Sequence, residues 1–531
     1  MHMQGCQPVG GVGMMPSKEP EMTTQDTIPT CYQSMIEHVR QTSLLGGTLG
    51  VLGWDQETMM PPGGLEYRSR QMSQLAGMKH TMATDPRLGE FLQACEEDAS
   101  LTSDPTSVEA VNIRQARRAY DKATRLPDSL VTEMARVESI AQHEWAAART
   151  DDDYDRFKPY LQQLLDLSRE KASCYGWPDD GEPWDALADN YEPGCSAAEI
   201  ERVFTPLRDS LQSLVADLVA SPTPPSNAFN ERALAIEAQE RFVRDVSERI
   251  GFDFNRGRLD RSTHPFCGGS NCNDVRMTTR FSESNVNDAL GSTLHESGHG
   301  IYEQGLLSEH VDTPMGSSVS LAIHESQSRM WENQVGRSRE YWKWCQGELS
   351  KYFGSSLDDL SIDDLYGGAN IVRPDFIRVE ADEATYNLHI MVRFQIERPL
   401  ISGDLGVDDI PETWNRLYKE YLGIEVPNDR LGCLQDVHWS FASFGYFPTY
   451  TLGNLYCAQF FEAALQEMPD LMDDFTRGEF TRLKDWLNRN IHAHGQRWLA
   501  ADLCEQVTGK PLSAEPLMRH LNNKLRPIYG I

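Results

Sequence analysis

The sequence predicts a mostly α-helical fold, organised as one large unit with a small antiparallel sheet. Apolar residues recur at i, i+3, i+4 and i+7 through most of the chain, a spacing typical of amphipathic helices. Strand-like segments are few and adjacent, and no linker separates regions of different composition. At 531 residues the chain is long enough to bury a large core.

The predicted elements alternate with breaks rich in proline and glycine. Helices are expected over residues 29–52, 104–149, 152–175, 196–220, 230–250 and 455–488. The breaks are residues 60–64, 191–194 and 221–225. Strands are expected at 257–266 and 276–281, where an exposed strand edge could accommodate a peptide.

The composition argues against several kinds of partner and location. The chain has 80 acidic and 49 basic residues, a formal net charge of −31, so we expect no nucleic-acid partner and no anionic membrane. No apolar run approaches the roughly 18–20 residues that span a bilayer. The 11 cysteines are scattered and odd in number, which favours reduced thiols in a cytoplasmic protein.

The first residues differ from the rest of the chain. Residues 1–27 are rich in Met, Gly and polar residues and show no periodicity, so we expect a disordered N-terminal tail. They lack the apolar or arginine-rich pattern of a targeting segment. Residues 28–531 are then one folded domain.

The segment HESGH at 295–299 is the most informative motif. On a helix, His295 and His299 lie one turn apart on the same face, where both can bind one tetrahedral zinc ion. Glu296 projects beside that ion and can take a proton from water, which is the chemistry of an HExxH metallopeptidase. The alternative is two ordinary helical histidines.

A catalytic zinc site usually needs a third protein ligand. The best candidate is Glu325 in AIHESQ, on a second helix expected over about residues 318–335. Residues 311–316 give a loop signal that lets the chain reverse between the two helices. The alternative for Glu325 is a solvated carboxylate.

Two further segments offer groups for a substrate. His264 precedes a proline in a loop that could reach the cleft, although a lone His-Pro is usually structural. Residues 377–393 are expected to be a helix with Arg378 and Asp382 on its polar face. Arg378 is then either paired with Asp382 or free to bind a substrate carboxylate.

The last polar group follows a glycine-rich stretch at 432–450. His438, Tyr446 and Tyr450 are suited to hydrogen-bond a tetrahedral oxyanion. Packing of these rings in an aromatic core is the alternative.

Together these segments resemble the carboxypeptidase Taq family of metallocarboxypeptidases. The matching motifs are GWDQETMMP at 53–61, YEPG at 191–194, HPF at 264–266, DVRMTTR at 274–280, HESGH at 295–299, HESQ at 324–327, IRVEADEATYNLHI at 377–390 and GCLQDVHW at 432–439. The resemblance covers about residues 30–531. Ala384 stands where the family usually has Leu.

The resemblance implies a helical fold with a deep central groove, similar to neurolysin-like and angiotensin-converting-enzyme-like peptidases, and a homodimer. It implies that His295, His299 and Glu325 are metal ligands and that Glu296 is the general base and acid. Arg378 matches the residue that holds the substrate's terminal carboxylate, and Tyr450 a substrate-binding tyrosine. Zn²⁺ is the expected metal, while Co²⁺ and Mn²⁺ suit the same ligands.

The leading hypothesis is therefore a metal-dependent carboxypeptidase that releases single amino acids from peptides with a free C-terminus. One alternative is the same chemistry with dipeptidyl or oligo-endopeptidase specificity. Another is a non-catalytic peptide-binding protein with a structural metal, which would need a fourth ligand such as Cys267 or His324.

Overall fold

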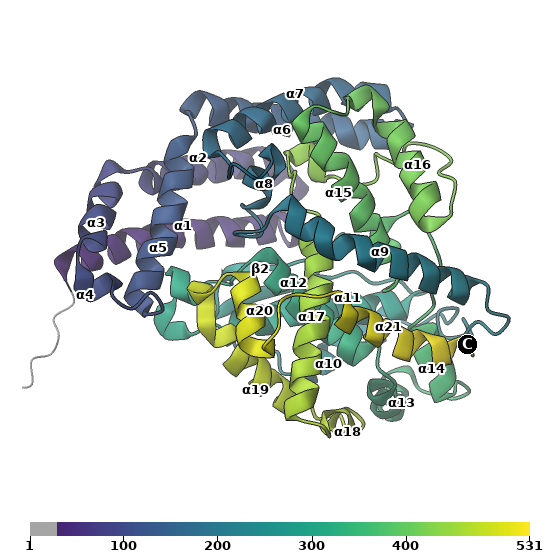
Figure 1. The fold of residues 1–531 in the computed structure, drawn as a ribbon. Helices are drawn as coiled ribbons and strands as arrows, with labels where there is room; N and C mark the ends of the chain where they lie inside the picture. Colours follow the sequence, from purple (N-terminus) through teal and green to yellow (C-terminus); the bar gives the residue numbers. More distant parts are fainter. Residues whose placement is uncertain (1–28) are drawn as a thin grey trace, which may run out of the picture.

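The computed structural model describes residues 29–531, and the predicted disordered tail at 1–27 lies outside the described residues. The prediction of a mostly helical fold with a small sheet is confirmed (Figure 1). Among the described residues, no helix combines the length and the apolar character needed to cross a membrane.

The N-terminal helices lie together at one side of the molecule, in purple and blue in Figure 1. They are α1 (Thr30–Thr58), α2 (Leu65–Ala83), α3 (Pro86–Glu96), α4 (Ala99–Thr102) and α5 (Val108–Arg125). The inner faces of α1, α3, α4 and α5 form a small core of their own, which includes Met35 and Leu92, whereas α2 has no buried residue.

The next helices pack against the main core. They are α6 (Asp128–Asp151), α7 (Tyr154–Tyr175), α8 (Pro183–Ala188), α9 (Ala197–Val219) and α10 (Ile236–Ile250). The single helix predicted over 104–149 is wrong, because α5 ends at Arg125 and α6 begins at Asp128. Pro127 disfavours helical geometry at the preceding residue, and Leu126 is extended, with φ −87° and ψ 125°.

The sheet contains β1 (Gly257–Arg261), β2 (Cys267–Asn271) and β3 (Asp274–Thr279), in the order β1-β3-β2. The prediction that it is antiparallel is only half right: β3 pairs antiparallel with β2 but parallel with β1. The chain reverses direction between β1 and β2 and again between β2 and β3, so β1 and β3 run in the same direction. Because β3 lies in the middle of the sheet, it pairs with β1 as a parallel neighbour.

The second half of the chain carries the remaining helices. They are α11 (Val286–Gly305), α12 (Leu321–Arg329), α13 (Arg339–Phe353), α14 (Ile362–Gly368), α15 (Tyr386–Ser402), α16 (Ile410–Leu422), α17 (Pro448–Glu467), α18 (Leu471–Phe475), α19 (Thr481–Asn490), α20 (Ala500–Thr508) and α21 (Glu515–Ile528). A π-helical turn, η4 (Met330–Gly336), extends α12. The helix predicted over 455–488 is in fact α17, α18 and part of α19.

The helix predicted over 377–393 begins only at Tyr386. Before it, Arg378–Glu380 form one 3₁₀ turn. The carboxylate of Asp382 accepts hydrogen bonds from the backbone N–H groups of Ala384 and Thr385, at 2.9 and 3.0 Å. An aspartate that binds the backbone this way starts a turn rather than continuing a helix.

Three helices meet at the centre of the molecule, where α12 packs between α11 and α17 (Figure 1). Glycine makes both contacts close. A Cβ on Gly298 would lie 2.4 Å from the carbonyl oxygen of Gln327, and one on Gly453 would lie 2.6 Å from Cβ of Glu325. The helices that carry HESGH and HESQ are therefore held in the protein core.

Candidate active site

The HESGH segment lies on α11, as predicted. The helix is capped by Asn285, whose side chain accepts a hydrogen bond from the N–H of Asp288 at 3.0 Å. His295 and His299 are one turn apart, with ring centroids separated by 4.9 Å. The cap and the helical spacing together place both imidazoles on the face that packs toward α12.

Glu325 completes a group of three candidate metal ligands. It lies on α12, which begins after the capping residue Ser320. Its Oε2 is 3.6 Å from Nε2 of His295 and 3.6 Å from Nε2 of His299. Two ligands of a tetrahedral ion with bonds of 2.0–2.1 Å are about 3.4 Å apart, so the residues fit one divalent ion.

No other group of metal-binding side chains of this kind is found in residues 29–531. The ligand atoms of His295, His299 and Glu325 all lie within 4.8 Å of one another. Neutral imidazole and carboxylate are the ligands that zinc uses in catalytic sites. The predicted third ligand therefore lies where the prediction requires.

A chain of charged groups connects two of these ligands. Nδ1 of His295 donates to Oε2 of Glu332 at 2.9 Å. Arg329 donates to that same oxygen at 2.9 Å, and to Oε1 of Glu325 at 2.7 Å. Burial would raise the pKa of Glu332, but Arg329 and His295 outweigh it and hold the pKa well below its usual range. Glu332 is therefore a carboxylate that can orient His295.

Sequence reasoning missed Arg329 and Glu332. Both lie in SRMWE, four and seven residues after Glu325, which places them on its face of the helix. That spacing was the available signal.

Glu296 is 5% exposed and lies beside the three ligands at the wall of a cavity of about 640 Å³. Burial raises its pKa to about 7, partly offset by the neighbouring His295. A bound cation would act in the opposite direction and favour the carboxylate. Glu296 is thus a carboxylate or carboxylic acid at the edge of the space that a substrate would fill.

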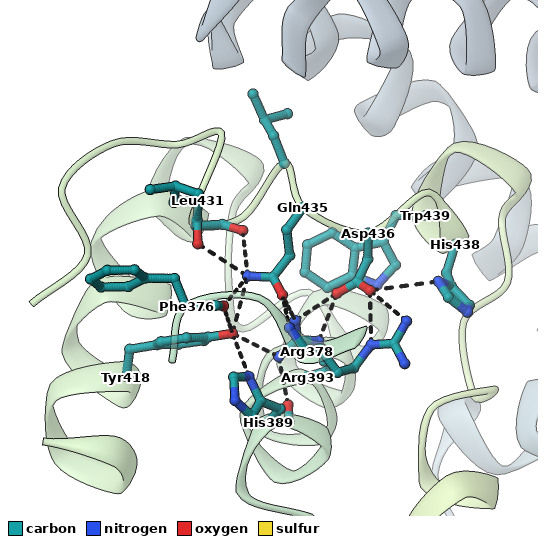
Figure 2. A network of polar contacts seen from close by, with 12 residues as sticks. Phe376, Arg378, His389, Arg393, Tyr418, Leu431, Gln435, Asp436, His438 and Trp439 are labelled. Carbon is teal, nitrogen blue, oxygen red and sulfur yellow. Dashed lines mark hydrogen bonds and ion pairs between the residues drawn. The ribbon is translucent and has the colours of Figure 1, made fainter. Parts of the chain in front are cut away.

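Arg378 lines the same cavity and is 5% exposed. Its partner is Asp436 and not Asp382: Nε of Arg378 donates to Oδ1 of Asp436 at 2.9 Å. Figure 2 shows Asp436 between the side chains of Arg378 and Arg393. Arg393 donates from Nη2 to Oδ2 at 2.6 Å. The predicted pairing of Arg378 with Asp382 is therefore wrong, while its binding to a substrate carboxylate stays a prediction.

Of the remaining predicted residues, some line the cavity and others lie behind its wall. His264 and Tyr450 line the cavity, together with Tyr386, whose hydroxyl accepts from Nη1 of Arg378 at 3.2 Å. His438 lies behind Tyr450, 3.3 Å from its hydroxyl.

Tyr446 packs beside these rings, 5.3 Å from Tyr450 and 5.2 Å from His438 between centroids. Neither Tyr446 nor His438 lines the cavity. Burial lowers the pKa of His438 to about 3, and the nearby positive charge of Arg378 contributes to this shift. The imidazole is therefore neutral at neutral pH.

Comparison with known proteins decides the family. Residues 34–525 match the model of the carboxypeptidase Taq (M32) metallopeptidases. The chain belongs to this family. It is 44% identical to thermostable carboxypeptidase 1 of Thermus thermophilus, over 95% of this chain and 100% of that protein. It is 34% identical to carboxypeptidase 1 of Bacillus subtilis, over 94% of this chain and 99% of that protein.

Solved structures agree with these sequence matches. The M32 carboxypeptidase from Deinococcus radiodurans R1 is 40% identical and superimposes with a TM-score of 0.91, covering 95% of this chain and 100% of that one. The family resemblance stated from the motifs is confirmed. The chain is a metallocarboxypeptidase, a hydrolase that acts on peptide bonds.

Proposed function

We propose that this M32 carboxypeptidase holds one zinc ion on His295, His299 and Glu325 and uses Glu296 as the general base and acid. The observation that carries the proposal is the convergence of the three ligand atoms within 4.8 Å, with Glu296 at the wall of the adjoining cavity. When bound, a divalent ion supplies Lewis acidity that polarises a carbonyl and acidifies water. Co²⁺ and Mn²⁺ suit the same donor atoms.

The carboxylate of Glu296 moves the proton. It accepts the proton of the attacking water, and then delivers it to the amine that leaves when the peptide bond breaks. At 5% exposure this carboxylate is largely shielded from bulk water during the transfer.

Arg378 receives the C-terminal carboxylate of the peptide. A guanidinium has N–H groups on Nε and on both Nη atoms. Asp436 engages Nε and Nη2, and Tyr386 engages Nη1. The remaining N–H groups on Nη1 and Nη2 form an end-on pair suited to a bidentate contact with a carboxylate.

The aromatic groups serve the oxyanion and the substrate chain. Tyr450 presents its hydroxyl to the cavity, and neutral His438 orients that hydroxyl from behind. Tyr446 supports both rings by packing. His264, exposed in the loop between β1 and β2, offers a further polar contact at the rim of the cavity.

The wider setting follows from charge and family. The net charge of −31 supports a protein with no nucleic-acid and no membrane partner. The scattered free cysteines support a cytoplasmic location. The family resemblance supports a homodimer, which light scattering of the purified protein tests directly.

Mass spectrometry of the products tests the reaction. Peptides with a blocked N-terminus and either a free or an amidated C-terminus are incubated with the zinc-loaded protein and with the chelator-treated protein. Stepwise loss of single residues from the free-acid peptides alone, abolished by the chelator and restored by zinc, is the expected result. Release of dipeptides, or internal cleavage of amidated peptides, would favour the alternative specificities. Metal binding without hydrolysis would favour a non-catalytic protein.

A further inference from the structure

A second polar chain lies behind His299, on the side away from Glu325. Nδ1 of His299 is 2.5 Å from Nδ1 of His324, and Nε2 of His324 is 2.8 Å from Oε1 of Glu303. Glu303 lies on α11, one turn after His299, and His324 lies on α12 directly before Glu325. The three groups therefore tie the two ligand-bearing helices together.

We propose that His324 and Glu303 are positioning residues that fix His299 in the form that binds the metal. This inference rests on the proposed metal site. Nε2 of His299 is the atom that faces Glu325, at 3.6 Å, so its lone pair must stay available and the ring hydrogen must lie on Nδ1.

The positions of the other hydrogens follow from that requirement. With hydrogen on Nδ1, His299 donates to His324, whose own Nδ1 must accept. The hydrogen of His324 then lies on Nε2, where it donates to Glu303, since a carboxylate only accepts. One arrangement satisfies every contact: it leaves the lone pair on Nε2 of His299 free and ends on the acceptor Glu303.

The two metal-binding histidines are thus supported differently. His295 donates directly to a carboxylate, Glu332, which two arginines also bind. His299 reaches its carboxylate only through a second imidazole. Packing keeps that imidazole in place, since the ring of Tyr302 lies 5.1 Å from the ring of His324 between centroids.

The structure also separates this role from direct ligation. Both ring nitrogens of His324 are engaged, one by His299 and one by Glu303. His324 does not belong to the group of side chains whose ligand atoms converge. It therefore acts through His299.

The test compares zinc affinity in four variants of the full chain, measured by competition with a chromophoric chelator. His324→Leu should bind zinc about 10–100-fold more weakly, still with one ion per chain. His324→Asn keeps an acceptor beside Nδ1 of His299 and should recover most of the loss. Glu303→Gln keeps an acceptor but removes the charge, and should weaken binding several-fold. Glu309→Gln, at an exposed position just after α11, is the control and should leave affinity unchanged.

Thermal unfolding of the metal-free proteins shows whether each variant folds. If His324→Leu does not fold, Glu303→Gln still tests the role of the chain from His299 to Glu303. Unchanged affinity in both His324→Leu and Glu303→Gln would overturn the proposal. So would an altered visible spectrum of cobalt-loaded His324→Leu together with no effect of Glu303→Gln, since His324 would then be a ligand. If the wild-type protein binds no ion, the proposed metal site itself fails.

Discussion

Arg378 binds Asp436 through two nitrogens, Nε at 2.9 Å and Nη2 at 2.8 Å, both to the same carboxylate oxygen. Arg393 holds the other oxygen, and the three side chains are between 0% and 9% exposed. Burial would raise the pKa of Asp436, but Arg378 and Arg393 outweigh it and hold the pKa well below its usual range. The carboxylate therefore stays charged and fixes the direction in which Arg378 faces the cavity.

Replacing Arg378 with Ala should raise KM and lower kcat/KM for free-acid peptides, because the terminal carboxylate loses its buried cation. The loss should correspond to roughly 2–4 kcal/mol of transition-state binding. Amidated peptides should change little. Arg373→Ala is the matched control, since Arg373 lines the same cavity but its side chain is 78% exposed. Equal losses on acid and amide peptides would mean that Arg378 has only a structural role.

Replacing Asp436 with Asn should destabilise the fold by roughly 3–5 kcal/mol, because two buried guanidinium groups lose their counter-charge. Denaturant unfolding measures the change. Asp359→Asn is the control: its side chain is 65% exposed and pairs with Arg232 at the surface, a contact worth no more than about 1 kcal/mol. Equal effects of the two substitutions would contradict the role given to the buried pair.

Replacing Glu296 with Gln should preserve metal binding and abolish most turnover, since an amide cannot take the proton of the attacking water. A general base contributes roughly 10²–10⁴-fold to the rate, and a loss of at least this size is expected in kcat. Metal content and kcat are measured on the same preparation. Turnover near the wild-type rate with the metal retained would remove Glu296 from this role.

Replacing Glu325 with Ala should weaken metal binding more than the roughly 10–100-fold typical of a group that only orients a ligand. The substitution removes one of three donors and leaves Arg329 without one of its two carboxylate partners. Chelator competition measures the affinity. Unchanged stoichiometry and affinity would place the third ligand elsewhere.

Glu397 should make the fold less stable as pH rises. Burial raises its pKa to about 7 from an ordinary value of 4.5, although Gly445, Trp439 and Trp184 donate hydrogen bonds to it. Its favourable contribution is complete below pH 4.5 and is lost as pH rises to about 7, an effect of about 3 kcal/mol.

The test for Glu397 is denaturant unfolding of wild type and Glu397→Gln at several pH values from 5 to 8. The glutamine does not titrate, so the stability difference between the two proteins should shift in favour of the variant as pH rises. A difference that stays constant with pH would show that Glu397 does not titrate in this window.

Local sequence was sufficient to identify the candidate metal ligands because their spacing is a helical property. His295 and His299 are one turn apart, and Glu325 follows a reversal signalled by proline and glycine. The same local reasoning accounts for α1, α7 and α9. It failed at Pro127 and at Asp382, where one residue ends or delays a helix inside an otherwise periodic pattern.

Contacts between distant segments were beyond such reasoning. The partner of Arg378 is Asp436, on another segment, whereas helical spacing pointed to Asp382, four residues after Arg378. The parallel pairing of β1 with β3 depends on which strand takes the middle of the sheet, and strand periodicity carries no information about that. The roles assigned to His264, His438, Tyr446 and Tyr450 stay predictions.

The close contacts at Gly298 and Gly453 bear on how the enzyme fails when heated. Elements that open independently of the rest are those with few buried contacts, and α11 and α12 are the opposite, with α12 enclosed between α11 and α17. We therefore expect no separate melting transition for the candidate metal-binding residues. Their amide hydrogens should exchange with solvent only when the whole molecule unfolds, and catalytic activity should survive to the temperature at which the core itself gives way.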